Sequence, residues 1–440
     1  MFRYENWTAD AEQGALTCRY SLDGREFAER VTLRPGPRWH TEAARAAARL
    51  VFLLAGVSYY KTAAPPVIDL GGTALTDTEL DFLREFYLQG LGEFAYRNDL
   101  DLSALQLLAP GGTTPPIPPP LLGRLLAPPN PPGRALVPFG GGIDSIVVVE
   151  RVRPKADVAL FVVSRPADRF AAIEAPAAVP GLPVVRAERK IDPQLLRSAE
   201  LGFRNGHVPV TGILSAIAVL AAVLENRDTV VMSNEWSASI PTLEYQGRPV
   251  NHQYSKSASF EAAFRGVLAA GPAGLPDYFS WLRDRTELWV GQEFAGLEQY
   301  HGSFRSCNKA FYTDPARRLD HWCGQCDKCC FIDLILAPFL SAAALHQIFA
   351  ATGEPLRDAS LAGKFRALLG AGTKPFECVG EVNECRAAVL LAARRDDRKG
   401  DRLLRELAGE VAARPDAPAD ADVAAMLAPV GEAFVPAGYR

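Results

Sequence analysis

Three consecutive glycines precede a predicted helix in the segment Pro138-Phe139-Gly140-Gly141-Gly142-Ile143-Asp144-Ser145. Glycine lets the chain turn tightly and brings backbone N–H groups against an anion, and the start of a helix adds the favourable end of its dipole. The Walker pattern is absent, because no Gly-Lys-Ser/Thr follows at the required spacing. The segment therefore predicts a phosphate-binding turn, and a plain glycine turn between strand and helix is the alternative.

The same segment resembles the PP-loop of ATP pyrophosphatases, whose pattern is Ser-Gly-Gly-x-Asp-Ser. Those enzymes cleave ATP between its α- and β-phosphates and transfer AMP to a carboxylate, amide or carbonyl oxygen. Gly140 stands where the pattern has its first serine, so one side-chain contact to phosphate is missing. The resemblance implies ATP as a cofactor, and we expect Asp144 to help position Mg²⁺ or the loop. We expect the nucleotide to be bound by residues at strand ends: Phe139, Gly140, Gly141, Gly142, Asp144, Ser145, Ser164, Asn234 and Glu235.

Five of the eight cysteines fall between Cys307 and Cys330. Such clustering favours metal or redox chemistry in a reducing compartment over a disulfide framework. Cys323, Cys326 and Cys329 form a doubled C-x-x-C, Cys307 can supply a fourth thiolate, and four sulfurs suit structural Zn²⁺. PP-loop enzymes of the queuosine pathway carry a similar zinc-binding arrangement, although the gap after the first cysteine is longer here. Reduced cysteines without metal and an iron–sulfur cluster are the alternatives.

Side chains that can move protons occur in two further polar stretches, Asn205-Gly206-His207 and the run from Asn251 to Ser257. Burial and neighbouring charges can tune such groups for acid–base catalysis. The candidate catalytic residues are His207, His252, Tyr254 and Lys256. Surface residues or hydrogen-bonded structural residues are the alternative interpretation.

Short apolar strands alternate with helices from residue 135 onward. The pattern predicts strands at 135–139, 158–163, 183–185 and 229–232, and helices at 144–152 and 208–224. This alternation indicates an α/β fold with a doubly wound parallel sheet, in which ligands bind beyond the carboxyl ends of the strands. The candidate nucleotide-binding residues lie at those ends.

The flanking regions differ in pattern. Residues 1–35 alternate as strands, 41–57 is helical, and Thr76 forms a predicted capping box with Glu79 at the start of another helix. Ten of the 34 prolines fall in 110–133, which favours an extended linker. We therefore expect an α+β N-terminal domain at 1–109, a linker at 110–133, a PP-loop catalytic domain at 134–335 and a helical region at 336–440.

Four motifs occur in one order: the glycine turn, Ser233-Asn234-Glu235-Trp236-Ser237, the stretch around His252, and the Cys-Gly-x-Cys-x-Lys-Cys segment. Together with Lys374-Pro375-Phe376-Glu377-Cys378-Val379-Gly380, the set resembles the UDP-N-acetylmuramoyl-L-alanyl-L-glutamate epimerase family, MurL. That resemblance implies ATP-dependent conversion of the terminal L-glutamate of a UDP-sugar-peptide to D-glutamate in peptidoglycan precursor synthesis. Adenylation of the glutamate carboxylate would make its α-proton removable. The implied enzyme is an isomerase that releases AMP and pyrophosphate.

The charge balance and apolar runs limit the partners. With 47 Lys+Arg against 51 Asp+Glu, nothing in the charge favours nucleic acid. We find no secretory signal, and the longest apolar run falls short of a membrane span, so we expect a cytoplasmic protein without a membrane partner. Two alternatives remain: a PP-loop ligase or thiolation enzyme acting on a base or tRNA, with Cys326 or Cys329 carrying sulfur, and a non-catalytic nucleotide sensor.

Overall fold

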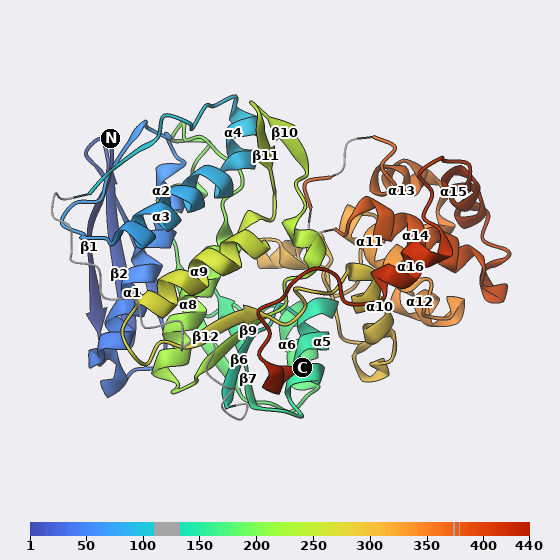
Figure 1. Ribbon diagram of the computed structural model, residues 1–440, viewed down its shortest axis with the longest axis horizontal. Helices are drawn as coiled ribbons and strands as arrows, with labels where there is room; N and C mark the ends of the chain where they lie inside the picture. Colours follow the sequence, from blue (N-terminus) through green and yellow to red (C-terminus); the bar gives the residue numbers. More distant parts are fainter. Residues whose placement is uncertain (110–132, 373–374, 378) are drawn as a thin grey trace.

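The computed structural model describes residues 1–109, 133–372, 375–377 and 379–440. Ten strands of these residues form one sheet in the order β12-β9-β6-β7-β8-β3-β2-β1-β4-β5 (Figure 1). Their bounds are β1 Phe2–Asp10, β2 Ala15–Leu22, β3 Arg25–Thr32, β4 Val67–Asp69, β5 Gln106–Leu108, β6 Arg134–Pro138, β7 Asp157–Ser164, β8 Val184–Lys190, β9 Thr229–Met232 and β12 Asp277–Ser280. The molecule is therefore an α/β protein around a large, mostly parallel sheet.

The half of the sheet from β12 to β8 is parallel throughout. Successive residues of β6 explain why helices cover both of its faces: Ala135 and Val137 enter one hydrophobic core, whereas Leu136 enters the other. Strands buried on both faces read as continuous apolar runs, which is the pattern that predicted β6, β7 and β9. The fifth parallel strand, β12, was not predicted, because its four residues Asp-Tyr-Phe-Ser carry polar groups at both ends.

The N-terminal strands extend this same sheet. β1, β2 and β3 pair antiparallel, and β3 joins β8 in antiparallel register, with Val31 opposite Arg189. The strands expected in a separate N-terminal domain and those of the expected nucleotide-binding domain thus share one set of backbone hydrogen bonds. The expected linker at 110–133 lies outside the described residues, apart from Gly133.

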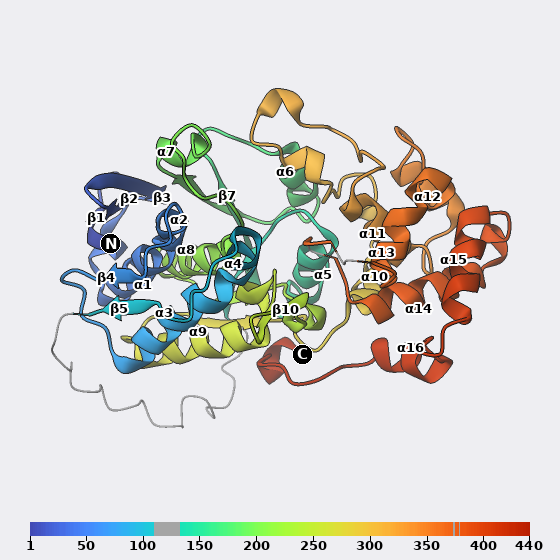
Figure 2. The same cartoon turned by 90° about the horizontal axis from the view of Figure 1, so that it is seen from above.

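The helices on the two faces of the sheet belong to two different hydrophobic cores (Figures 1 and 2). One core includes α1 Glu42–Ala55, α3 Asp77–Gly90, α8 Val210–Leu224 and α9 Ala258–Ala270. The other includes α5 Ile143–Val152, α6 Ala171–Ala178, α10 Glu287–Ala295 and α11 Asp327–Leu336, and it continues into the C-terminal helices α12 Ala342–Ile348, α13 Ala362–Leu368, α14 Val382–Ala393, α15 Arg402–Ala412 and α16 Asp420–Met426. The C-terminal helices therefore extend the second core away from the N-terminal strands.

Local signals in the sequence predict several helix starts correctly. Thr41 caps α1, and Thr76 forms the expected capping box with Glu79 at the start of α3. The smaller elements are the helices α2 Val57–Tyr60, α4 Gly92–Asn98 and α7 Pro193–Leu196 and the hairpin β10 Leu243–Tyr245 with β11 Arg248–Val250. Within the described part of the chain, every helix is too short or too polar to cross a bilayer.

Candidate active site

The glycine turn lies between the end of β6 and the first turn of α5, as the sequence predicts. Gly141 has a φ of +78°, and a Cβ at this position would lie 2.3 Å from the carbonyl oxygen of Ala172, so a side chain does not fit. Ser145 Oγ donates a hydrogen bond of 3.0 Å to the carbonyl oxygen of Gly142. The turn thus aims the N-terminus of a ten-residue helix at the carboxyl edge of the sheet, where an anion is favoured.

The neighbouring strand ends carry the other predicted nucleotide-binding residues. Ser164 is the last residue of β7, and Asn234 follows β9. Ser280 Oγ fixes the Asn234 backbone from β12, accepting from its N–H and donating to its carbonyl oxygen, each over 2.6 Å. The side chain of Phe139 is 4% exposed and packs in the core, so this residue supports the turn by packing.

Three carboxylates meet beyond this edge of the sheet. Asp144 comes from α5, Glu235 follows β9, and Glu287 begins α10, and an oxygen atom of each lies within 4.8 Å of the others. Asp144 and Glu235 were predicted, whereas Glu287 was missed. Acidic residues are common in the first turn of a helix because of the dipole, so its sequence context carries no functional signal.

Glu287 is the member of this carboxylate cluster whose ionised form is strongly disfavoured. Burial raises the pKa of its carboxyl well above the usual range, and the charges of Asp144 and Glu235 raise it further. Its Oε2 atom is buried and has no hydrogen-bond partner among the described residues. Crowded carboxylates need a proton or a cation, and hard oxygen ligands are those that Mg²⁺ prefers. The residues present therefore fit a divalent cation.

A second group brings together Glu93 of α4 and the predicted residues His207 and His252. The imidazole rings are 4.3 Å apart between centroids. Glu93 Oε2 contacts Nδ1 of His252 and lies 4.0 Å from Nδ1 of His207, while Glu93 Oε1 accepts a 2.6 Å hydrogen bond from Nε of Arg97. The sequence does not single out Glu93, because a glutamate with an arginine four residues later is typical of an exposed helix pair.

A close backbone approach and a side-chain hydrogen bond hold the loops of the two histidines in place. Gly206 has a φ of +155°, and a Cβ there would lie 2.9 Å from the ring of Phe94, so glycine lets the loop that carries His207 approach α4. Asn251 Nδ2 donates a 2.9 Å hydrogen bond to the carbonyl oxygen of Ala238, which anchors the residue before the second histidine. Tertiary packing, and not their positions in the sequence, therefore brings His207 and His252 into contact.

The remaining two candidate catalytic residues differ in position. Lys256 Nζ donates a 3.2 Å hydrogen bond to Oε1 of Gln253, and its charge contributes to the lowered pKa of His207. Tyr254 is 7% exposed, its ring lies 6.0 Å from that of Phe260, and burial raises the pKa of its hydroxyl. The structure therefore brings Lys256 near the histidines and packs Tyr254 into the core.

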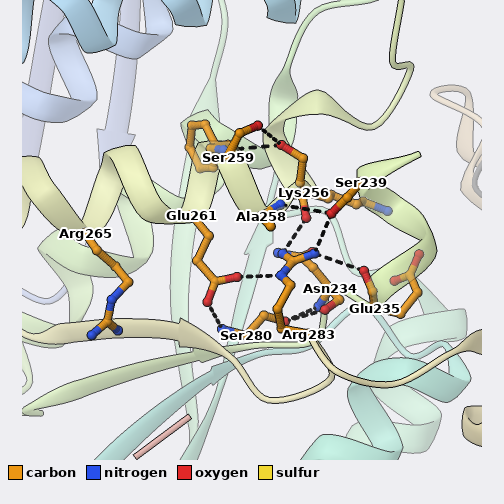
Figure 3. Close-up of polar contacts among 12 residues, drawn as sticks. Asn234, Glu235, Ser239, Lys256, Ala258, Ser259, Glu261, Arg265, Ser280 and Arg283 are labelled. Atoms are coloured by element: carbon orange, nitrogen blue, oxygen red, sulfur yellow. Dashed lines mark hydrogen bonds and ion pairs between the residues drawn. The ribbon is translucent and has the colours of Figure 1, made fainter. Parts of the chain in front are cut away.

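Arg283 connects the two groups (Figure 3). Its Nε forms a 2.8 Å ion pair with Glu261, and both side chains are 1% exposed. Its Nη1 donates to the carbonyl oxygen of Glu235 over 3.0 Å, and its Nη2 donates to that of Lys256 over 2.6 Å. One buried guanidinium thus holds the loop of the carboxylate cluster against the loop that follows His252, so the two groups adjoin.

The four predicted zinc ligands also converge. The Sγ atoms of Cys307, Cys323, Cys326 and Cys329 all lie within 4.8 Å of one another, and Cys329 Sγ is 3.4 Å from that of Cys326 and 3.7 Å from that of Cys323. Zn–S bonds of about 2.3 Å place tetrahedral sulfurs about 3.8 Å apart, so this donor set fits zinc. Hydrogen bonds from Cys326 and Cys329 lower the pKa of Cys307, which favours the thiolate.

Polar groups gathered beyond the carboxyl ends of parallel strands define an α/β enzyme. Family models described as the MurL N-terminal domain and the MurL C-terminal domain match residues 1–281 and 303–422. The chain belongs to the MurL family.

Three relatives named UDP-N-acetyl-alpha-D-muramoyl-L-alanyl-L-glutamate epimerase match nearly end to end. The protein of Xanthomonas oryzae pv. oryzae is 38% identical over 99% of this chain and 95% of its own length. That of Salinispora tropica is 38% identical over 100% and 94%, and that of a Micromonospora species is 37% identical over 93% and 90%. No solved structure shows a significant match to the chain.

Proposed function

We propose that this chain epimerises the terminal L-glutamate of UDP-N-acetylmuramoyl-L-alanyl-L-glutamate to D-glutamate, in peptidoglycan precursor synthesis. The observation that carries the proposal is the near full-length similarity to three relatives that bear the name of this epimerase. The adjoining acidic and histidine groups support it, because the reaction needs both carboxylate activation and proton exchange. Clustered thiols support a cytoplasmic setting, where they stay reduced.

The free carboxylate of the substrate explains why ATP is needed. Loss of the neighbouring α-proton would place more negative charge on a group that is already anionic. Transfer of AMP from ATP to that carboxylate, with release of pyrophosphate, neutralises it and provides an acyl group that delocalises the new charge as an enolate. A base then removes the α-proton, a proton returns on the other face, and hydrolysis releases AMP.

We assign nucleotide binding to a PP-loop-type site at the glycine turn. The N-terminus of α5 and the turn 140–145 would hold the phosphates, with Ser164 and Asn234 at the adjacent strand ends. Asp144, Glu235 and Glu287 would hold Mg²⁺, which when bound offsets phosphate charge. A bound cation would remove the repulsion at Glu287, which explains why three carboxylates lie so close together.

Proton exchange is assigned to the histidine group. Burial, reinforced by the charge of His252, lowers the pKa of His207 to about 4, so at neutral pH His207 is an uncharged imidazole that can accept a proton. Burial alone would raise the pKa of Glu93, but the hydrogen bond and charge of His252, together with the hydrogen bond from Arg97, outweigh that effect and the pKa is lowered. Glu93 therefore stays ionised and orients the imidazole of His252.

Zn²⁺ is proposed as a structural ion of the four-cysteine cluster. Cys307 lies on the chain that follows α10, and Cys329 lies in the first turn of α11. Bound zinc would join these two segments, which both pack in the second hydrophobic core. The cluster is thus assigned to stability and not to chemistry at the substrate.

The test is an incubation of the protein with ATP, Mg²⁺ and the L-glutamate precursor in deuterated water. We expect AMP, pyrophosphate and a D-glutamate product that carries deuterium at its α-carbon. AMP release is read by chromatography and deuterium by mass spectrometry. Absence of both AMP and α-deuterium from a folded, metal-loaded protein would overturn the proposed function.

A further inference from the structure

The two histidines touch each other, so they act on the same face of a carbon placed beside them. Their ring centroids are 4.3 Å apart, which leaves no room for an atom between the rings. A carbon flanked by bases on opposite faces needs about 6 Å between the two nitrogen atoms, because each reacting pair approaches to about 3 Å. An inversion that uses two bases on opposite faces of the α-carbon therefore needs a second proton-transfer group from another element.

A segment of the C-terminal region reaches the histidine pair from outside the N-terminal half of the chain. The ring of Phe376 lies 6.2 Å from that of His252 and 6.0 Å from that of Tyr96 in α4, and the guanidinium of Arg97 lies 4.8 Å above it. Phe376 thus anchors residues 375–377 beside His252. These residues belong to a sequence motif to which the proposed function gives no role.

The next residue, Glu377, is a half-buried carboxylic acid. Its Oε1 accepts a 2.9 Å hydrogen bond from Nδ2 of Asn308, and Asn308 directly follows Cys307 of the thiol cluster. Burial raises the pKa of Glu377, and the charge of His252 acts on it in the opposite direction. The carboxyl therefore lies within electrostatic range of His252, and it belongs to residues 375–377, a segment that carries neither histidine.

We infer, resting on the proposed function, that Glu377 is the second proton-transfer group and protonates the glutamate α-carbon on the face opposite to the histidines. His207 takes the α-proton as the C–H bond breaks and its electron pair enters the enolate of the activated acyl group. The O–H bond of Glu377 then breaks, and its proton forms the new C–H bond as the electron pair returns to carbon. His207 afterwards loses its proton to water, and the Glu377 carboxylate regains one from water.

Glu377→Gln separates exchange from inversion in the deuterium assay. The histidine side still removes the α-proton of the L-epimer and returns solvent deuterium to the same face. We expect AMP release and α-deuteration of the L-glutamate precursor to persist, while D-product falls about 100-fold or more, the range of general acid–base catalysis. Glu298→Gln, at an exposed position outside the site, should leave both rates unchanged.

Two results would overturn this assignment. One is D-product formation by Glu377→Gln within about threefold of the wild-type rate; the other is equal loss of exchange and inversion in a variant with wild-type AMP release. If Glu377→Gln does not fold, Glu377→Asp replaces it, and the ratio of L-deuteration to D-product should rise because the shorter acid reaches the carbon less well. Failure of the proposed function would differ, because the wild type itself would then release no AMP and exchange no deuterium.

Discussion

The carboxylate cluster and the histidine group adjoin but are built in opposite ways. Asp144 and Glu287 lie in the first turns of α5 and α10, Glu235 follows β9 of the parallel half-sheet, and the charges of the three carboxylates repel. Glu93, His207 and His252 come from a helix and two loops, and the charge of Glu93 is balanced by His252 and Arg97. A repelling cluster on a rigid frame suits binding of a cation, whereas a compensated group on loops suits movement of a proton. We therefore assign activation of the substrate to the carboxylate cluster and proton exchange to the histidine group.

The most far-reaching expected effect comes from removing one charge of the carboxylate cluster, because activation comes before proton exchange. Glu287→Gln should lower AMP release by about 100-fold or more, because Mg²⁺ loses a ligand. The same variant should melt at a higher temperature without ATP, since the buried like-charge repulsion is relieved. Chromatography of AMP and thermal melts measure the two effects. Normal AMP release by this variant would show that the carboxylate cluster takes no part in the activation step.

His207→Asn should impair proton exchange at the histidine group and leave activation at the carboxylate cluster intact. We expect α-deuterium exchange to fall by about 10²–10⁴-fold, because the neutral base is lost, while the first turnover of AMP release stays within a few fold of wild type. Rapid-quench assays with mass spectrometry measure both. Equal loss of the two activities would contradict separate roles for the two groups.

Cys329→Ser should affect stability and metal content more than chemistry. Loss of one of four thiolates should abolish stoichiometric zinc and cost several kcal/mol of unfolding free energy. Cys330→Ser is the matched control, because this neighbouring cysteine is buried but lies outside the four-thiol cluster. Elemental analysis and urea unfolding measure the effects, and equal zinc in both variants would count against a zinc site at these four thiols.

The smallest effect is a pH dependence of stability from His207. Its pKa of about 4 lies below the ordinary value of 6.5, so the unfolded state binds the proton more tightly. Stability contributed by the neutral imidazole is therefore complete above pH 6.5 and declines as the pH falls toward 4, by up to about 3 kcal/mol. Urea unfolding at pH 4.5 and pH 7.5 should show a smaller difference for His207→Gln than for wild type. An identical difference would place His207 in a solvated environment.

Local signals explain which parts of the molecule were predictable. The strand, glycine turn and helix around Gly141, and the doubled C-x-x-C, are short patterns whose physics lies within a few residues. Glu93 and Glu287 were missed because each looks like an ordinary helix glutamate, and only contacts with residues far along the chain give it a role. The junction of β3 with β8 was equally invisible, since strand pairing over more than 150 residues leaves no local pattern.

The central claim is that activation of the carboxylate must precede proton exchange. α-Deuteration of the L-glutamate precursor with α,β-methylene-ATP, which cannot transfer AMP with loss of pyrophosphate, tests it most directly. We predict exchange with ATP and none above background with the analogue. Exchange with the analogue at a rate comparable to that with ATP would contradict it.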